Sequence, residues 1–202
     1  MRARLQAIIV AVASSGPAFA LVLALAVGSF VGLDRIAAGF PPLAGGALPF
    51  DLQNGLAVAD VYAQLAAWSP AARTRYYAFS AVDWLFPLAA GLFLAATVAV
   101  CLRRSLPRAW AWVTGRQLLP LLLLGTACDW LENVFALLAV GLYPLESPLL
   151  ALGLVAAKRA KLAALFPSQG LMVGLLLYTA VLAVVRRAAP RPPAPPAPPS
   201  AT

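Results

Sequence analysis

Four long apolar runs, separated by shorter polar or turn-forming stretches, dominate the hydropathy pattern of this chain. About 20 apolar residues at roughly 1.5 Å each cross a hydrocarbon core of roughly 30 Å, and every run is long enough to do so. We therefore predict an all-α fold, a membrane-embedded four-helix bundle. The predicted spans are residues 5–33, 76–102, 117–143 and 162–185.

Local signals refine two of these runs. Ser69 is a good N-cap and Pro70 suits the first helical position, so a helix is predicted to begin there. Within the first run, Gly16 and Pro17 predict a kink, because proline removes a helix hydrogen bond and clashes with the preceding turn. The run continues past Ala20, which favours an uncleaved anchor over a cleaved signal peptide.

The remaining segments have distinct patterns. Residues 34–75 form a predicted outer loop, in which apolar residues near helical spacing indicate a short amphipathic helix lying over the bundle. Residues 147–161 carry three basic residues and are predicted to be an interfacial helix, continuous with the fourth span or bent against it. The proline-rich tail, 190–202, is predicted to be disordered.

The charge distribution predicts the orientation. The chain has 15 Lys and Arg against 7 Asp and Glu, and the basic residues stand at the ends of apolar runs. This placement argues against nucleic acid as a partner. With the N-terminus inside, the inner segments hold nine basic residues and no acid, whereas the outer segments hold six basic and four acidic residues. The positive-inside rule therefore places both termini in the cytoplasm. The excess of arginine over lysine and the abundance of alanine fit a GC-rich bacterium, so we expect the membrane to be a bacterial inner membrane.

The composition narrows the available chemistry. The chain has no histidine and only two cysteines, so imidazole bases, histidine-ligated metals and thiolate metal sites are excluded. No cofactor and no metal centre are predicted. The oligomeric state is not specified by any pattern in the sequence.

Three acidic residues fall inside the predicted spans, Asp83 in the second and Asp129 and Glu132 in the third. Counting about 1.5 Å per residue from the span ends places all three at a similar depth in the outer half of the membrane. Asp129, Glu132 and Asn133 stand at i, i+3 and i+4, so their side chains share one helix face. If that face meets Asp83, an acidic cluster forms.

Such a cluster needs compensation, because a charge near the bilayer centre costs about 2.5 to 3.5 kcal/mol. The candidate charge partners are four basic residues of the predicted outer side: Arg73, Arg75, Lys158 and Lys161. Two interpretations stay open. The charges form a buried ion-pair network that holds the helices in register, or the acids form a site for a ligand, a substrate or a proton.

Three short motifs follow one another in this region: R-x-x-Y from Arg73, D-x-x-F-P from Asp83 and D-x-x-E-N from Asp129. Their order resembles a family of small bacterial four-span membrane proteins with no assigned activity, over about residues 51–161. The resemblance implies the four-helix topology and the choice of acids. It implies no reaction.

These patterns favour a protein that binds or transports a cation, a proton or a cationic amphiphile at the acidic cluster, with membrane lipid and a small cationic ligand as partners. The alternative is a structural or assembly protein whose acids only fix helix register. An intramembrane lipid enzyme is the least favoured hypothesis, because its chemistry would depend on carboxylates alone or on a metal held by their oxygen atoms.

Overall fold

A computed structural model describes residues 1–188, and this part of the chain contains helices and no strand. The predicted disordered tail, 190–202, lies outside the described residues. The elements in chain order are α1 (Arg2–Ser14), α2 (Gly16–Ala38), η1 (Pro41–Leu43), η2 (Phe50–Leu52), α3 (Val58–Ala67), α4 (Pro70–Asp83), α5 (Phe86–Ser105), α6 (Pro107–Gly115), η3 (Leu119–Leu123), α7 (Leu124–Leu142) and α8 (Pro148–Ala188).

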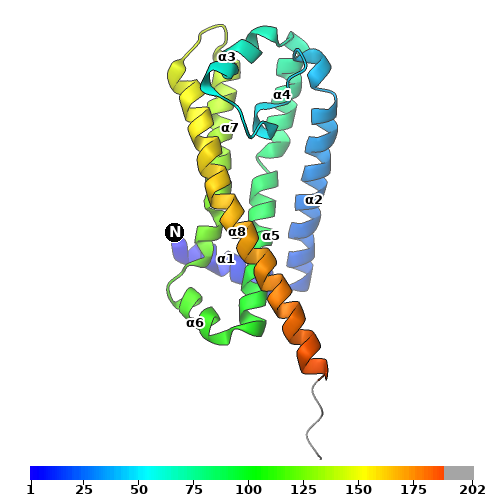
Figure 1. Cartoon of the computed structure of the whole chain (residues 1–202), viewed down its shortest axis with the longest axis vertical. Coiled ribbons are helices and arrows are strands. Elements are labelled where there is room, and N and C mark those ends of the chain that lie inside the picture. Colours follow the sequence, from blue (N-terminus) through cyan, green and yellow to red (C-terminus); the bar gives the residue numbers. More distant parts are fainter. Residues whose placement is uncertain (189–202) are drawn as a thin grey trace, which may run out of the picture.

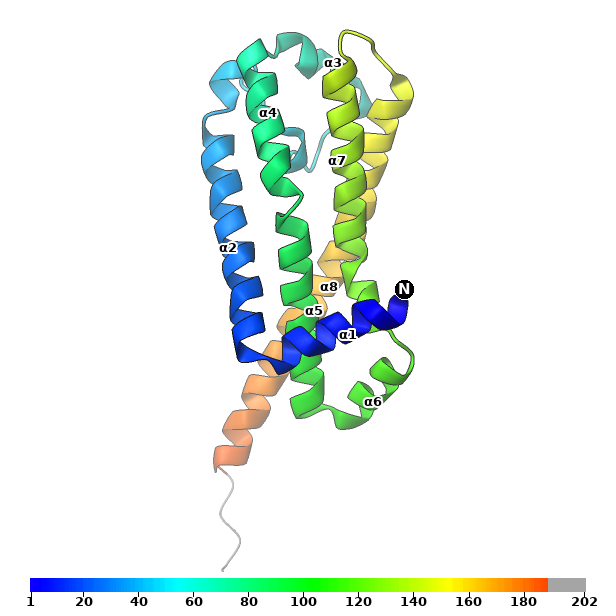
Figure 2. The ribbon, with the colours of Figure 1, turned by 180° about the vertical axis from the view of Figure 1, so that it is seen from behind.

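The long helices run along one axis, with short helices at both ends. Figures 1 and 2 show α2, α4 followed by α5, α7 and α8 along the long axis, α1 and α6 at one end and α3 at the other. Four segments are long and apolar enough to cross a membrane: Gly16–Ala38, Pro70–Ser105, Leu119–Leu142 and Pro148–Ala188. The prediction of an all-helical chain with four candidate membrane spans is confirmed.

The predicted first span, 5–33, is wrong in its extent, because the run forms two helices. Ser15 has an extended backbone (φ −116°, ψ 113°) and separates α1 from α2. Its hydroxyl accepts a hydrogen bond from the Ala18 N–H at 3.3 Å, and Pro17 stands in the first turn, where its missing N–H costs nothing. The break is sharper than the predicted kink: α1 crosses the end of the bundle beside α5 and η3, and α2 alone is the candidate span (Figure 2).

The helix predicted at 147–161 is continuous with the fourth span, which is one of the two arrangements that the sequence left open. It is the first part of α8, which continues without interruption past Pro167 to Ala188. This part packs antiparallel to α7 (Figure 2), and Leu154 and Lys158 are buried there. The segment therefore forms part of the helix bundle, where Lys158 and Lys161 have carboxyl partners on α7.

A break interrupts the second candidate span between α4 and α5. Pro87 has no N–H, so the carbonyl of Asp83 has no donor four residues later. Two side chains of α7 form hydrogen bonds with the backbone at this break. Trp130 Nε1 donates to the Trp84 carbonyl at 3.0 Å, and the Thr126 hydroxyl donates to the Pro87 carbonyl at 2.7 Å. The irregular backbone is thus tied to α7 at the level of Asp83.

Aromatic side chains form the core at the α3 end. The ring of Phe50 lies 4.8 Å from that of Trp68 and 5.7 Å from that of Tyr76, measured between centroids. The short helix α3 turns its buried residues Val61 and Leu65 toward this core. The loop that carries η2 dips between α4 and α7 (Figures 1 and 2), which brings Phe50 into the bundle.

Candidate functional site

α7 turns its acidic face into the bundle. Asp129 is 7% exposed, and Glu132 and Asn133 are fully buried. On the other side of the helix, Leu131 and Val134 are 48% and 39% exposed. The spacing of the three polar residues therefore stacks them on the inward face, and the apolar residues between them point outward.

Two lysines of α8 meet this face. Lys158 Nζ lies 2.5 Å from Glu132 Oε1, and Lys161 Nζ lies 2.6 Å from both Glu132 Oε2 and Asp129 Oδ1. Asp129 and Glu132 are three residues apart on α7, and Lys158 and Lys161 are three residues apart on α8. Because the two helices are antiparallel, each lysine lies opposite an acid. Glu132 bridges two ammonium groups, an arrangement that holds α7 against α8.

Asp83 joins the cluster from the last residue of α4. It is 5% exposed, and its Oδ2 atom accepts a hydrogen bond from Asn133 Nδ2 at 2.9 Å. Within residues 1–188, no lysine or arginine lies at ion-pair distance from Asp83. The only hydrogen-bond partner of this carboxyl group in that range is a neutral amide.

Asp51 is a fourth member of the cluster, which the sequence analysis placed in the outer loop. It is 8% exposed, and its Oδ2 atom accepts a hydrogen bond from the Tyr76 hydroxyl at 2.8 Å. Lys158 Nζ donates to the carbonyls of Phe50 and Asp51, at 2.9 and 3.2 Å. Asp51 Oδ1 is buried and has no hydrogen-bond partner in the described part of the chain.

The two arginines predicted as charge partners do not pair with the acids in the described residues. The Arg73 guanidinium lies 4.7 Å from the ring centroid of Tyr143, and Arg75 packs beside Gly39. Arg73 is ten residues from Asp83, about 15 Å along α4, which is too far for its side chain to reach that carboxyl group. Of the four predicted partners, the two lysines alone form ion pairs with the acids.

Several of the acids border a small, partly open space, which we call the acidic chamber. Its volume is about 150 Å³, and it is lined by Phe30, Leu33, Asp34, Asp51, Leu52, Asp83, Phe86, Asp129 and Lys161. The carboxyl groups that line it are those of Asp34, Asp51, Asp83 and Asp129, together with the ammonium group of Lys161, whereas Glu132 and Lys158 lie outside its lining.

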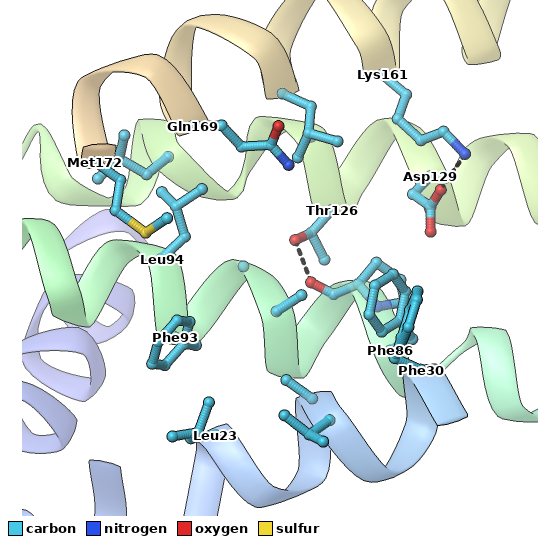
Figure 3. A pocket seen from close by; sticks show the side chains of 18 residues that line it. Leu23, Phe30, Phe86, Phe93, Leu94, Thr126, Asp129, Lys161, Gln169 and Met172 are labelled. Atoms are coloured by element: carbon cyan, nitrogen blue, oxygen red, sulfur yellow. Dashed lines mark hydrogen bonds and ion pairs between the residues drawn. The ribbon is translucent and has the colours of Figure 1, made fainter. Parts of the chain in front are cut away.

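A larger and mostly apolar space adjoins the chamber (Figure 3), and we call it the α2–α8 groove. Its volume is about 410 Å³, and its walls come from α2 and α8, with α5 and α7 between them. Asp129 and Lys161 stand at one end of the groove, whereas Phe93 and Met172 stand toward the other. The groove is thus charged only where it meets the chamber.

The carboxyl groups of the cluster do not form a metal site by their arrangement. In the range 1–188, no group of three or more His, Cys, Asp or Glu side chains is placed to hold a metal ion. The acids instead face lysines, an amide and a tyrosine hydroxyl.

Comparison of the chain with protein-family models, with curated proteins and with solved structures finds no match. The resemblance to small four-span bacterial proteins therefore depends on the three motifs alone. Any function must be inferred from the chemistry of the site.

Proposed function

We propose that this chain is a multi-pass protein of a bacterial inner membrane that binds a cation in the acidic chamber. The observation that supports the proposal is an imbalance of charge. Four carboxyl groups, those of Asp51, Asp83, Asp129 and Glu132, meet two ammonium groups. Both lysines pair with Glu132 or Asp129, so the carboxyl groups of Asp51 and Asp83 are in formal excess.

Buried carboxyl groups without a cationic partner are costly. A buried ionised group needs a counter-charge and hydrogen bonds, and without them it lowers the free energy of unfolding. A proton, a metal cation or an ammonium group would each reduce this cost. Costly groups inside a membrane protein are generally found at functional sites. The excess therefore favours a cation site over a network that serves stability alone.

An organic ammonium group suits the walls of the chamber best. Phe30 and Phe86 line the chamber together with the acids, and aromatic rings attract cations through their π faces. The chamber volume of about 150 Å³ is several times the roughly 30 Å³ that a water molecule occupies in the liquid. It has room for a small ammonium group.

The basic residues support a cytoplasmic location for the end that carries α1 and α6. Arg103 of this end donates hydrogen bonds to the Ser14 hydroxyl at 2.8 Å and to the Ala13 carbonyl at 3.0 Å. The other basic side chains of this end are Arg2, Arg4, Arg104, Arg108, Arg116, Arg186 and Arg187. By the positive-inside rule the acidic chamber then lies in the outer half of the membrane.

The test is the thermal stability of the full chain, purified in a nonionic detergent, with tetramethylammonium chloride or with sodium chloride at the same concentration. A ligand that binds only the folded state stabilises it by about 2.7 kcal/mol at a concentration of 100 Kd. We expect tetramethylammonium to raise the melting temperature of the wild type more than sodium does.

Two variants show whether the effect belongs to the chamber. Asp83→Asn removes an excess carboxyl group, and we expect it to lose the tetramethylammonium effect. Glu146→Gln removes an exposed carboxyl group outside the cluster, and we expect it to keep the effect. An equal shift in all three proteins, or none in the wild type, contradicts the proposal.

A purely structural role is the second candidate. The observation that favours it is the position of Glu132, fully buried between Lys158 and Lys161 at 2.5 and 2.6 Å. Such a bridge fixes the register of α7 and α8 without any ligand. This role explains the paired acids but gives no reason for the excess carboxyl groups of Asp51 and Asp83.

A further inference from the structure

The α2–α8 groove has no use in the binding of a small cation. We propose that the ligand of the acidic chamber is a cationic amphiphile, whose ammonium headgroup lies in the chamber and whose hydrocarbon chain lies in the groove. The inference rests on the proposed function, and it adds the chemical class of the ligand and the side from which it arrives.

The two spaces share part of their lining. Phe30, Phe86, Asp129 and Lys161 border both the chamber and the groove. The rings of Phe30 and Phe86 lie 6.1 Å apart between centroids, and Figure 3 shows them close to Asp129. These shared residues form a junction between the two spaces. A molecule that lies across the junction has its charged end among the carboxyl groups of the chamber and its apolar end among the apolar side chains of the groove.

The groove has the size and the composition of a ligand site. Its volume of about 410 Å³ falls in the range of about 300 to 1,000 Å³ that is usual for small-molecule pockets. Leu23, Val27, Phe93, Leu94 and Met172 give it an apolar lining beyond the charged end. A hydrocarbon chain needs no polar partner there.

The mouth of the groove lies at the level of the membrane interior. Its wall on α2 is formed by residues 23–30, near the middle of the candidate span Gly16–Ala38. Val27 and Phe30 in this wall are 53% and 58% exposed. In a bilayer these side chains face lipid, so an amphiphile reaches the groove sideways from the membrane.

The charge of the chamber selects the headgroup. Asp51 is more than nine-tenths buried, lines the chamber and has an Oδ1 atom without a partner in the described residues. Within residues 1–188, the only hydrogen-bond partner of the Asp83 carboxyl group is the Asn133 amide. A cationic headgroup brings a positive charge beside these two carboxyl groups and compensates one of the two formal charges, whereas a neutral or anionic headgroup compensates neither.

The experiment uses a long-chain trimethylammonium probe with a photoreactive diazirine on its chain, added to the full-length protein in nonionic detergent. Crosslinked residues are located by mass spectrometry. We expect crosslinks at residues 23–30 and 161–172, reduced about tenfold or more by Asp83→Asn, because a charge-assisted contact is lost. A probe with the same chain and a hydroxyl headgroup should react across the whole lipid-facing surface.

A pair of valines on α2 gives a matched control. Val27 lines the groove and Val31 does not, and both are exposed. Val27→Trp should narrow the groove and reduce the crosslinks at 161–172 about fivefold or more, while stabilisation by tetramethylammonium is kept. Val31→Trp should change neither result.

The possible failures are distinguishable. Crosslinks spread evenly over the surface, and insensitive to Asp83→Asn and Val27→Trp, overturn the amphiphile inference. If tetramethylammonium still stabilises the wild type in that case, the cation site stands and only its ligand class is wrong. If tetramethylammonium has no effect either, both proposals fail.

Discussion

The two halves of the acidic cluster differ in how their charge is compensated. Asp129 and Glu132 lie on α7 and meet two lysines in register, at 2.5 to 2.6 Å. Asp51 and Asp83 meet a tyrosine hydroxyl and an amide, which carry no charge. The first pair of acids is placed to join helices. The second pair has no cationic partner within residues 1–188, which is the observation on which the proposed cation site depends.

The backbone follows the same division. The paired acids stand within a regular helix, whereas Asp83 ends α4 at the proline break and Asp51 belongs to the short turn η2. Irregular backbone at membrane depth is tolerated where it is buried in protein or lines a cavity. The unpaired acids thus lie where the helices are interrupted beside the chamber.

The largest effect is expected from Lys158→Met, which removes a buried ammonium group that joins Glu132 to the carbonyls of Phe50 and Asp51. Breaking a buried ion pair costs about 3 to 5 kcal/mol, because the remaining charge loses its partner. The loss in the free energy of unfolding is measurable by titration with a denaturing detergent in mixed micelles.

Arg159→Met is the control for Lys158→Met, because this neighbouring basic residue is exposed. It should change the free energy of unfolding by less than about 0.5 kcal/mol. Equal losses in the two variants would show that the ion pairs on α7 and α8 add nothing to stability.

Tyr76→Phe, which affects Asp51, is expected to lower the free energy of unfolding by a smaller amount. The variant removes the hydroxyl that donates to Asp51 Oδ2 at 2.8 Å and leaves that buried carboxyl oxygen without a donor. The expected loss is about 1 to 3 kcal/mol in the same titration. Tyr77→Phe changes the adjacent tyrosine, which is 45% exposed, and should leave stability near that of the wild type.

The hydrogen bond between α7 and the proline break should contribute less to the free energy of unfolding than either of these contacts. Thr126→Val removes the hydrogen bond to the Pro87 carbonyl at 2.7 Å and keeps the size of the side chain. A neutral hydrogen bond is worth about 0.5 to 1.5 kcal/mol. Thr74→Val, at an exposed position of α4, is the control. If Thr126→Val lowered the free energy of unfolding as much as Lys158→Met does, the hydrogen bond at the proline break would contribute as much to stability as the buried ion pairs.

The regular parts of this arrangement were predictable from the sequence. The length and apolarity of the runs are sufficient to predict the helices, and the spacing of Asp129, Glu132 and Asn133 predicts their common face. The matching i, i+3 spacing of Lys158 and Lys161 was a signal that pairs them with the acids of an antiparallel neighbour. Unless the spacing of the lysines is compared with that of the acids, the sequence does not show which of the four basic residues pair with them.

The irregular parts were not predictable. Asp51 lies in a loop rich in glycine and proline, and hydropathy does not reveal that the loop folds back between α4 and α7. Its neighbour Phe50, fully buried, was the only local hint. Gly16 and Pro17 indicate a kink near Ser15, but they do not show that the chain turns there sharply enough to leave the apolar residues of α1 outside the span.

The central claim is that the two halves of the cluster serve different purposes, and one pair of nearly isosteric variants tests it directly. The free energy of unfolding of Glu132→Gln and Asp83→Asn is compared with that of the wild type, without ligand and at neutral pH. We predict a loss of about 3 to 5 kcal/mol for Glu132→Gln, which leaves the buried Lys158 ammonium without a carboxyl partner in residues 1–188 and leaves Lys161 with Asp129 alone. We predict no loss or a gain for Asp83→Asn, which removes an uncompensated carboxyl group. A similar loss in both variants would contradict the claim and reduce the cluster to a structural ion-pair network.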